Sequence, residues 1–290
     1  MVLPEAVKEQ IRGLRYLPAS GGGRGVVVDS SGDVKTLVRN LRSVVASDPA
    51  LCAKILQVAN SEVYGHPRQI GTLDFALMVI GFDAASEILI GIRLVSSLNR
   101  ELAVPHCLKG MAQHSLSTAL LSENIARAVR YPVTGEAFVA GLLHDIGLLV
   151  LSQVRRSGLE RAREITRQAD TSFISAEERV LGFTHAEVGS WLGEAWGFPP
   201  RISEAIAFHH TPVRATRHKQ LASLVCLADA LSPRLTGETP PWEELVQPTE
   251  ELLGSAGLLG PRALEEVLSR ASADLAVQNE LRSTLAQTEE

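Results

Sequence analysis

Apolar residues recur every three or four positions along most of the chain, which is the spacing of amphipathic helices, and turn-forming residues separate these segments. Near the amino-terminal end, Asp48 can cap a helix that has Pro49 at its first position. Further along, Thr72 starts a short helix that ends at Gly81, and Asp83 caps a longer one. The pattern predicts a helical bundle in the first hundred residues.

The middle of the chain contains two segments that we expect to pack as antiparallel helices. The first runs from Pro105 to about Arg130, and His114 lies on its apolar stripe, so this histidine should face inward. The second, residues 137–151, reads AFVAGLLHDIGLLVL and is the most apolar run in the chain. A helix that is apolar on every side is normally buried. The adjacent His144 and Asp145 at its centre are therefore unusual, because an unpaired buried carboxylate costs several kcal/mol.

Three further helices in the second half of the chain also carry polar residues. Thr184 and Glu187 have the spacing of a capping box, which would place His185 in the first turn of a helix. The next helix ends in two adjacent histidines. A later apolar helix, LASLVCLADAL, has Asp229 as its only charged residue.

The composition favours an all-α fold. Aromatic residues make up only 4% of the 290 residues, while Leu, Ala and Val are abundant, which suits helix packing better than a β-sandwich. The formal net charge of −5 implies no general nucleic-acid-binding surface. The three cysteines lie far apart without CxxC spacing, as expected of reduced thiols. Because we find neither a secretory signal nor a membrane span, we expect a soluble cytoplasmic protein.

We expect the chain to divide into an N-terminal helical part (residues 1–103), a helical core with the candidate site (104–235) and a C-terminal helical tail (236–290). The glycine-rich stretch Gly21–Gly23 matches no phosphate-binding motif and should form a loop. The tail from Pro261 has an apolar face that could dock on the bundle or form a homodimer.

Seven histidine and aspartate residues fall on or at the ends of these apolar helices: His114, His144, Asp145, His185, His209, His210 and Asp229. Convergence on divalent cations explains them together, because imidazole and carboxylate groups suit transition metals such as iron, manganese, zinc and nickel. One ion would bind His114, His144, Asp145 and Asp229, and a second would share Asp145 with His185, His209 and His210. Two ions that share a carboxylate suit activation of water and binding of a phosphoryl oxygen, so Asp145 would be catalytic in an active enzyme.

Simpler interpretations of single residues stay open. A lone His-Asp pair is more often a core histidine beside an aspartate that pairs with arginine. His185 can be a partly exposed first-turn residue, and His209 and His210 can complement the negative carboxyl end of their helix. The cluster as a whole can also be a polar network without metal.

The motifs together resemble a known superfamily. The order His114, His144-Asp145 and Asp229 is similar to the HD metal-dependent phosphohydrolases, and the other three histidines are similar to those of HD-GYP cyclic dinucleotide phosphodiesterases. Over roughly Leu14 to Leu235 the chain resembles the HDOD domains, which are bacterial signalling relatives of both. The motifs that carry this resemblance are Asp48-Pro49-Ala50-Leu51, Ala59-Asn60-Ser61, Ile80-Gly81, Gly141-Leu-Leu-His-Asp-Ile-Gly147, Phe183-Thr-His-Ala-Glu-Val-Gly189, Trp196-Gly-Phe-Pro199, His209-His210 and Ala228-Asp229.

Three positions depart from the enzymes in this superfamily. Leu148 stands where HD-GYP proteins have a lysine, and Thr211-Pro212-Val213 replaces their GYP motif. Gly110 stands where such enzymes can carry a glutamate, one turn before the first histidine. Loss of the lysine removes a cation that can hold a phosphate.

The resemblance implies an HD-domain-like bundle with an N-terminal helical subdomain and a retained metal site. It also implies a regulatory protein with little or no hydrolase activity, which acts through a signalling protein partner or a nucleotide ligand. The alternative is an active metal-dependent phosphohydrolase or phosphodiesterase that acts on nucleotides or cyclic dinucleotides.

Overall fold

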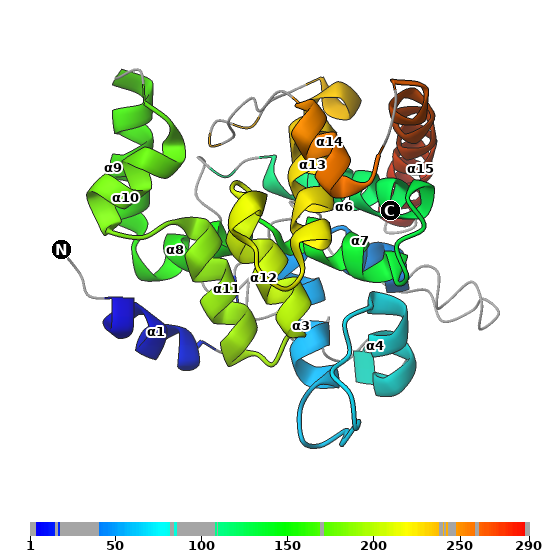
Figure 1. Ribbon diagram of the computed structural model, residues 1–290. Coiled ribbons are helices and arrows are strands. Elements are labelled where there is room, and N and C mark those ends of the chain that lie inside the picture. The colour runs from blue at the N-terminus through cyan, green and yellow to red at the C-terminus, as the bar shows by residue number, and fades with distance from the viewer. Residues whose placement is uncertain are drawn as a thin grey trace.

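The computed structural model describes residues 4–14, 17, 41–81, 84–85, 108, 110–168, 171–237, 240, 242, 248–258 and 261–287. These residues form an all-α fold, as the sequence predicts (Figure 1). Its helices are α1 (Pro4–Arg12), α3 (Pro49–Ala59), α4 (Leu73–Ile80), α6 (Met111–Ala128), α7 (Thr134–Leu143), α8 (Ile146–Val154), α9 (Arg156–Gln168), α10 (Phe173–Leu181), α11 (His185–Ala195), α12 (Pro200–Phe208), α13 (Lys219–Thr236), α14 (Glu250–Ala256) and α15 (Pro261–Gln287), with a short 3₁₀ helix η3 (Pro212–Arg214). In Figure 1, α9 and α10 lie on one side of the molecule and α14 and α15 on the other.

The two predicted helices near the amino-terminal end are confirmed. The Asp48 carboxylate accepts a hydrogen bond from the backbone N–H of Ala50 at 3.0 Å, and α3 begins at Pro49. The Thr72 hydroxyl caps α4, which ends before Gly81 with its left-handed φ of 82°. The longer helix predicted to begin at Asp83 lies largely outside the described residues.

The centre of the fold consists of α6, α7 and α13, which pack closely against one another. A β-carbon at Gly141 on α7 would lie 2.5 Å from the Ser122 hydroxyl and 2.9 Å from the Thr118 carbonyl, so only glycine permits this approach to α6. The prediction that the helix of His114 begins at Pro105 is wrong. Gly110, with a φ of 91°, precedes α6, which begins at Met111.

The prediction of one continuous helix over residues 137–151 is also wrong. The chain leaves the helical conformation at Asp145 (φ −95°, ψ 8°), so α7 ends at Leu143 and α8 begins at Ile146. Beyond this break α8 packs on α11, and a β-carbon at Gly147 would lie 1.9 Å from the His185 carbonyl oxygen. The close backbone contact explains why α8 needs a glycine at position 147.

The segment Thr134–Val154 is long and apolar enough to cross a bilayer by length and composition, although the sequence run suggested a shorter stretch. Within the fold, however, 89% of its most apolar window is buried, as is usual for the central helices of a bundle. Its apolar character is therefore explained by packing.

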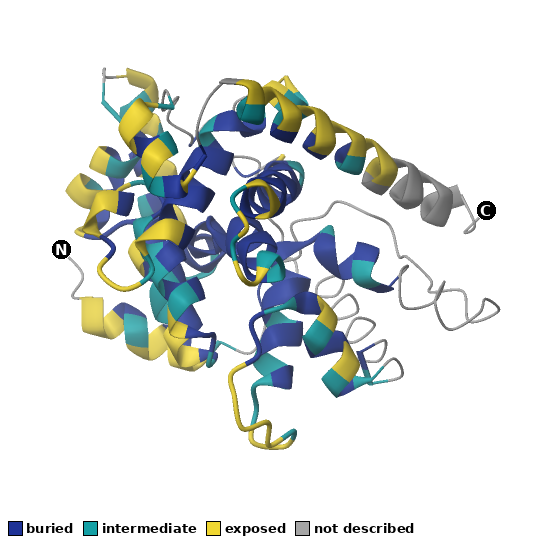
Figure 2. Cartoon of the chain, turned by 45° about the vertical axis from the view of Figure 1, so that its right-hand side comes forward, coloured by how far each residue is buried: buried dark blue, intermediate teal, exposed yellow. Residues whose placement is uncertain are grey.

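The described turns of the tail helix α15 dock on the bundle, which was one of the two arrangements expected. Val267 and Ala271 are buried, and Asn124 on α6 donates a hydrogen bond to the Asp274 carboxylate at 2.8 Å. Figure 2 shows the buried face of α15 turned toward the fold and its exposed face turned outward. The predicted domain boundaries at residues 103 and 235 stay predictions.

Candidate metal centre

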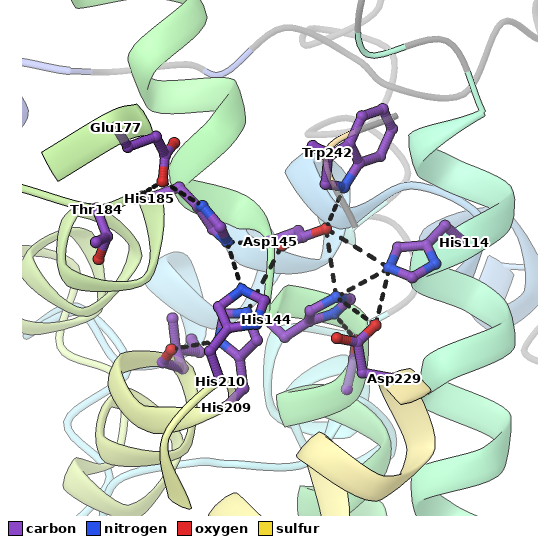
Figure 3. A network of polar contacts seen from close by, with 12 residues as sticks. His114, His144, Asp145, Glu177, Thr184, His185, His209, His210, Asp229 and Trp242 are labelled. Carbon is purple, nitrogen blue, oxygen red and sulfur yellow. Dashed lines mark hydrogen bonds and ion pairs between the residues drawn. The ribbon is translucent and has the colours of Figure 1, made fainter. Parts of the chain in front are cut away.

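The structure brings together all seven histidine and aspartate residues that the sequence singled out (Figure 3). His114 comes from α6, Asp229 from α13, and His144 and Asp145 from the break between α7 and α8. The other three come from the start of α11 and the end of α12. Six of the seven are buried, and His210 is half-buried. Their role as metal ligands stays a prediction at this point.

The side chains form two groups, in each of which one ligand atom per residue lies within 4.8 Å of all the others. The first ligand group is His114, His144 and Asp229. The second ligand group is Asp145, His185, His209 and His210. In the first group, Asp229 Oδ1 lies 3.1 Å from His114 Nε2 and 3.4 Å from His144 Nε2.

Asp145 lies between the two groups, and each of its oxygens faces one of them. Oδ2 is 3.3 Å from His144 Nε2 and 3.6 Å from His114 Nε2. Oδ1 is 3.1 Å from His185 Nε2 and 3.8 Å from His209 Nε2. This is the arrangement of a carboxylate that bridges two cations.

Backbone carbonyls fix the orientation of two of the imidazole rings. His144 Nδ1 lies 2.7 Å from the Gly141 carbonyl oxygen, and His209 Nδ1 lies 2.7 Å from that of Ile206. Because a carbonyl can only accept, Nδ1 carries the proton in both rings, and Nε2 of the neutral ring presents its lone pair to the cluster. Metal-binding histidines are held in this way in most known sites.

Glu177 orients a third ring, a role that could not be predicted from the sequence. Its buried Oε2 accepts hydrogen bonds from His185 Nδ1 at 2.8 Å and from the His185 backbone N–H at 3.0 Å. The predicted capping box of Thr184 and Glu187 is confirmed and places His185 at the first position of α11. A carboxylate behind the imidazole fixes the proton on Nδ1 and makes Nε2 a better ligand.

Two further contacts come from residues that the sequence reading did not select. The indole N–H of Trp242 donates to Asp145 Oδ2 at 2.7 Å. The Ser232 hydroxyl lies 3.1 Å from His114 Nδ1, and it can donate or accept there. Ser232 follows Asp229 by three residues on α13, so helical spacing places both on one face.

Several buried polar atoms in the cluster have no hydrogen bond with acceptable geometry: Asp145 Oδ1, Asp229 Oδ1 and His209 Nε2. Imidazole nitrogens and carboxylate oxygens, the atom types that bind transition metals, face one another at 3.1 to 3.8 Å. Ligand atoms that share a transition metal at about 2.0–2.2 Å are roughly 3 to 4 Å apart. The donor set and its spacing therefore fit divalent transition-metal ions, and the buried groups could hold one in each ligand group.

The electrostatics of the cluster keep most ligands in the form that binds metal. Burial raises the pKa of Asp145 and of Asp229, but nearby histidines, His144 foremost, lower it more, so both pKa values lie well below the usual range. Burial and the neighbouring histidines lower the pKa of His209 well below its ordinary value and that of His210 to about 4. These residues are an ionised carboxylate pair and two neutral imidazoles at pH 7.

In His144 and His185, a second proton on the ring can supply positive charge where no metal ion is bound. Burial lowers the pKa of His144, but Asp145 and Asp229 raise it well above the usual value. Burial likewise lowers the pKa of His185, but Glu177 and Asp145 outweigh it and raise the pKa to about 10. A metal ion must displace these protons, so the polar-network interpretation remains the alternative to be tested.

A cavity of about 280 Å³ borders the cluster at His210 alone among the seven residues. Three glutamates line this cavity, Glu178, Glu187 and Glu194. Among the described residues of its lining, Arg214 is the one that carries a positive charge. The negative charge is unfavourable for a phosphate ester.

The comparisons with known proteins agree with the fold. The model of the HDOD domain family matches residues 27–212, which is well over half of the chain. An uncharacterized protein of Treponema pallidum (strain Nichols) is 24% identical over 203 residues, which are 68% of this chain but 38% of that protein, so the chain spans well under half of that relative.

Two solved structures share the fold at low identity. The MmoQ response regulator of Methylococcus capsulatus has a TM-score of 0.62 and 23% identity, and the alignment covers 91% of this chain and 95% of that one. An HDOD domain protein of unknown function from Geobacter sulfurreducens has a TM-score of 0.52 and 21% identity over 97% of this chain and 93% of its own. Asp229 and Trp242 lie beyond the residues that the family model matches.

Proposed function

The chain belongs to the HDOD family, and from this we propose that it is a regulatory module whose buried histidine–aspartate cluster binds divalent transition-metal ions and which acts by binding rather than by hydrolysis. The main support for the proposal is that the ligand groups suit cations, whereas their surroundings do not suit a phosphate. The ligand set for cations is complete in the first and second ligand groups, while the surroundings that would hold a phosphate are apolar or acidic.

Two features of the surroundings support the absence of hydrolase activity. Leu148, at the position of the HD-GYP lysine, is fully buried among apolar side chains and offers no charge to a phosphate. The cavity beside His210 has three carboxylates in its lining, and its Arg214 guanidinium lies over the ring of Phe208, 6.0 Å from the centroid. Tight binding of phosphate requires converging cations or N–H donors, whereas Arg214 is the one cation among the described residues at these positions.

The metal ligands would be the seven residues of the two groups, with Asp145 shared and Glu177 holding His185 in place. Iron, manganese, zinc and nickel all suit a set of imidazoles and carboxylates. When bound, such an ion could lower the pKa of a water ligand and polarise a phosphoryl oxygen. This is why an active phosphohydrolase or phosphodiesterase remains the second candidate, favoured by the complete ligand set.

A signalling role also draws support from the M. capsulatus protein, a response regulator with a similar fold. We propose that the chain passes on a conformational change to a signalling protein, with a nucleotide as a further ligand and a homodimer as a further assembly. Of the described surfaces, α15 is the one we assign to a partner copy or protein, because its outer face is exposed along several turns (Figure 2).

A turnover assay separates regulation from hydrolysis. The full chain, loaded in turn with iron, manganese, zinc and nickel, is incubated with cyclic dinucleotides and nucleotide monophosphates beside an Asp145→Ala variant. We expect no difference in product between the two proteins. Turnover by the wild-type protein that the substitution abolishes would overturn the regulatory proposal and establish the hydrolase.

A further inference from the structure

Trp242 is a buried aromatic residue whose polar atom points into the candidate metal centre. It lies between α13 and α14, and only 3% of its surface is exposed. Its indole N–H donates to Asp145 Oδ2 at 2.7 Å, across 97 residues of sequence (Figure 3). A buried tryptophan usually finds a partner for its N–H, but here the partner is the carboxylate between the two ligand groups.

The hydrogen bond distinguishes the two oxygens of Asp145. An indole N–H can only donate, so Oδ2 must accept its hydrogen bond. The same oxygen also faces His144 and His114. With Oδ2 held, rotation of the carboxylate is restricted, and Oδ1 stays directed at His185. Oδ1 itself has no hydrogen bond of acceptable geometry.

The ring of Trp242 also covers one side of the cluster. Its centroid lies 6.3 Å from that of His114, with an angle of 83° between the ring planes. Beyond the indole, Leu108, Leu159, Arg163 and Phe173 line the same narrow space, whose volume of about 10 Å³ is at the lower limit for one water molecule. Among the described residues on this side, that space is too small for a phosphate ester.

We propose that Trp242 is a positioning residue: its N–H holds the Asp145 carboxylate as a bridge between the two ligand groups, and its ring closes the His114 side of the cluster. The role in metal binding rests on the proposed function above. Trp242 does not contact the ions; it acts through Asp145.

The variant that tests the positioning role is Trp242→Phe, which keeps an aromatic ring and removes the N–H. Loss of a residue that orients a metal ligand typically weakens metal binding by about 10- to 100-fold. We expect a loss of this size for zinc, measured by calorimetric titration of the full chain. The matched control is Trp191→Phe, because Trp191 is half-buried beside Phe183 and lines the cavity at His210, away from Asp145. The control should bind zinc like the wild-type protein.

A second readout follows the hydrogen bond itself. In protein labelled with ¹⁵N at the indole nitrogens, the resonance lost in Trp242→Phe identifies Trp242. Asp145→Asn replaces a charged acceptor by a neutral one, so this resonance should move upfield while that of Trp191 stays in place. Zinc should shift the Trp242 resonance and leave Trp191 unchanged.

The outcomes distinguish failure of the positioning role from failure of the proposed function. If the wild-type chain binds no zinc or other metal of the set, the proposed function fails, and the positioning role falls with it. If the wild-type chain binds zinc and Trp242→Phe binds it as tightly as Trp191→Phe, only the positioning role is overturned. A Trp242 resonance that does not respond to Asp145→Asn would overturn the hydrogen bond on which that role depends.

Discussion

The two ligand groups differ in their surroundings. The first combines Asp229 from the middle of α13, His114 from the first turn of α6 and His144 from the carboxyl end of α7, and Trp242 covers it. The second takes His185 from the first position of α11 and its other two histidines from the end of α12, and it borders a cavity through His210. The described residues around the first group leave no cavity beside it, whereas the second group is open to a cavity at His210.

This difference indicates different uses for the two groups. An enclosed group can retain an ion through the life of the protein, because exchange requires the surrounding helices to separate. The group beside the cavity can exchange an ion or sense a ligand without such a change. Asp145 connects the two, so a change at the second group can reach the first through its carboxylate.

Asp145→Asn should have the largest effect, because it alters the ligand that both groups share. At free metal 100-fold above Kd, each ion stabilises the fold by about 2.7 kcal/mol, so loss of both removes roughly twice this amount. The quantity to measure is the increase in unfolding free energy on addition of metal, in the variant and in the wild-type chain. An equal increase in both proteins would show that Asp145 is not a ligand shared by the two ions.

Asp229→Asn should affect the first ligand group alone. We expect it to lose the stabilisation by one ion, about 2.7 kcal/mol under the same conditions, and to keep that of the second. Asp74→Asn is the matched control, since Asp74 is exposed and pairs with Arg42 on the surface. If the cluster is a metal-free network with a protonated aspartate, Asp229→Asn and the control will behave alike, and neither protein will respond to metal.

Gly147→Ala should disturb the second ligand group through the backbone. The new β-carbon would lie 1.9 Å from the His185 carbonyl oxygen and 2.8 Å from the Gly189 backbone nitrogen, neither of which can rotate away. Overpacking of this kind costs about 1–3 kcal/mol in denaturant unfolding. Gly254→Ala on α14 has no atom within 4 Å of its β-carbon and should be neutral or stabilise by up to about 1 kcal/mol. Equal stability of the two variants would contradict the close contact of α8 and α11.

Glu177→Gln should weaken the second group and leave the first group unchanged. Its amide holds His185 less firmly than the carboxylate does, and we expect about 10- to 100-fold weaker binding of one ion, or about 1.4–2.7 kcal/mol. Glu178→Gln is the neighbouring control, because Glu178 is exposed and does not contact His185. Calorimetry with two resolved binding steps would show whether only the second step weakens; weakening of both would argue against separate groups.

The parts of the fold that the sequence predicts correctly are those that local chemistry determines. Asp48, Thr72 and Thr184 cap helices through residues only two or three positions away, and all three helices begin where predicted. The break at Asp145 could not be found this way. It depends on the contact between Gly147 and His185, which lie far apart in the sequence, and an unbroken apolar run conceals it.

For the candidate site, too, one part could be predicted from the sequence and another part could not. Histidine and aspartate are costly in apolar helices, so their convergence could be predicted from composition and position without any contact being known. Glu177 and Trp242 gave no such signal, because a glutamate on an amphipathic helix and a tryptophan between helices are ordinary residues. Only the folded chain shows that their polar atoms reach His185 and Asp145.

The most direct test of the central claim is the metal content of the full chain, purified without chelators, loaded with each candidate metal, desalted and analysed by mass spectrometry of the elements. We expect at least one tightly held ion per wild-type chain and a second that desalting removes more readily, with neither retained by Asp145→Ala. A wild-type chain that retains no iron, manganese, zinc or nickel would contradict it.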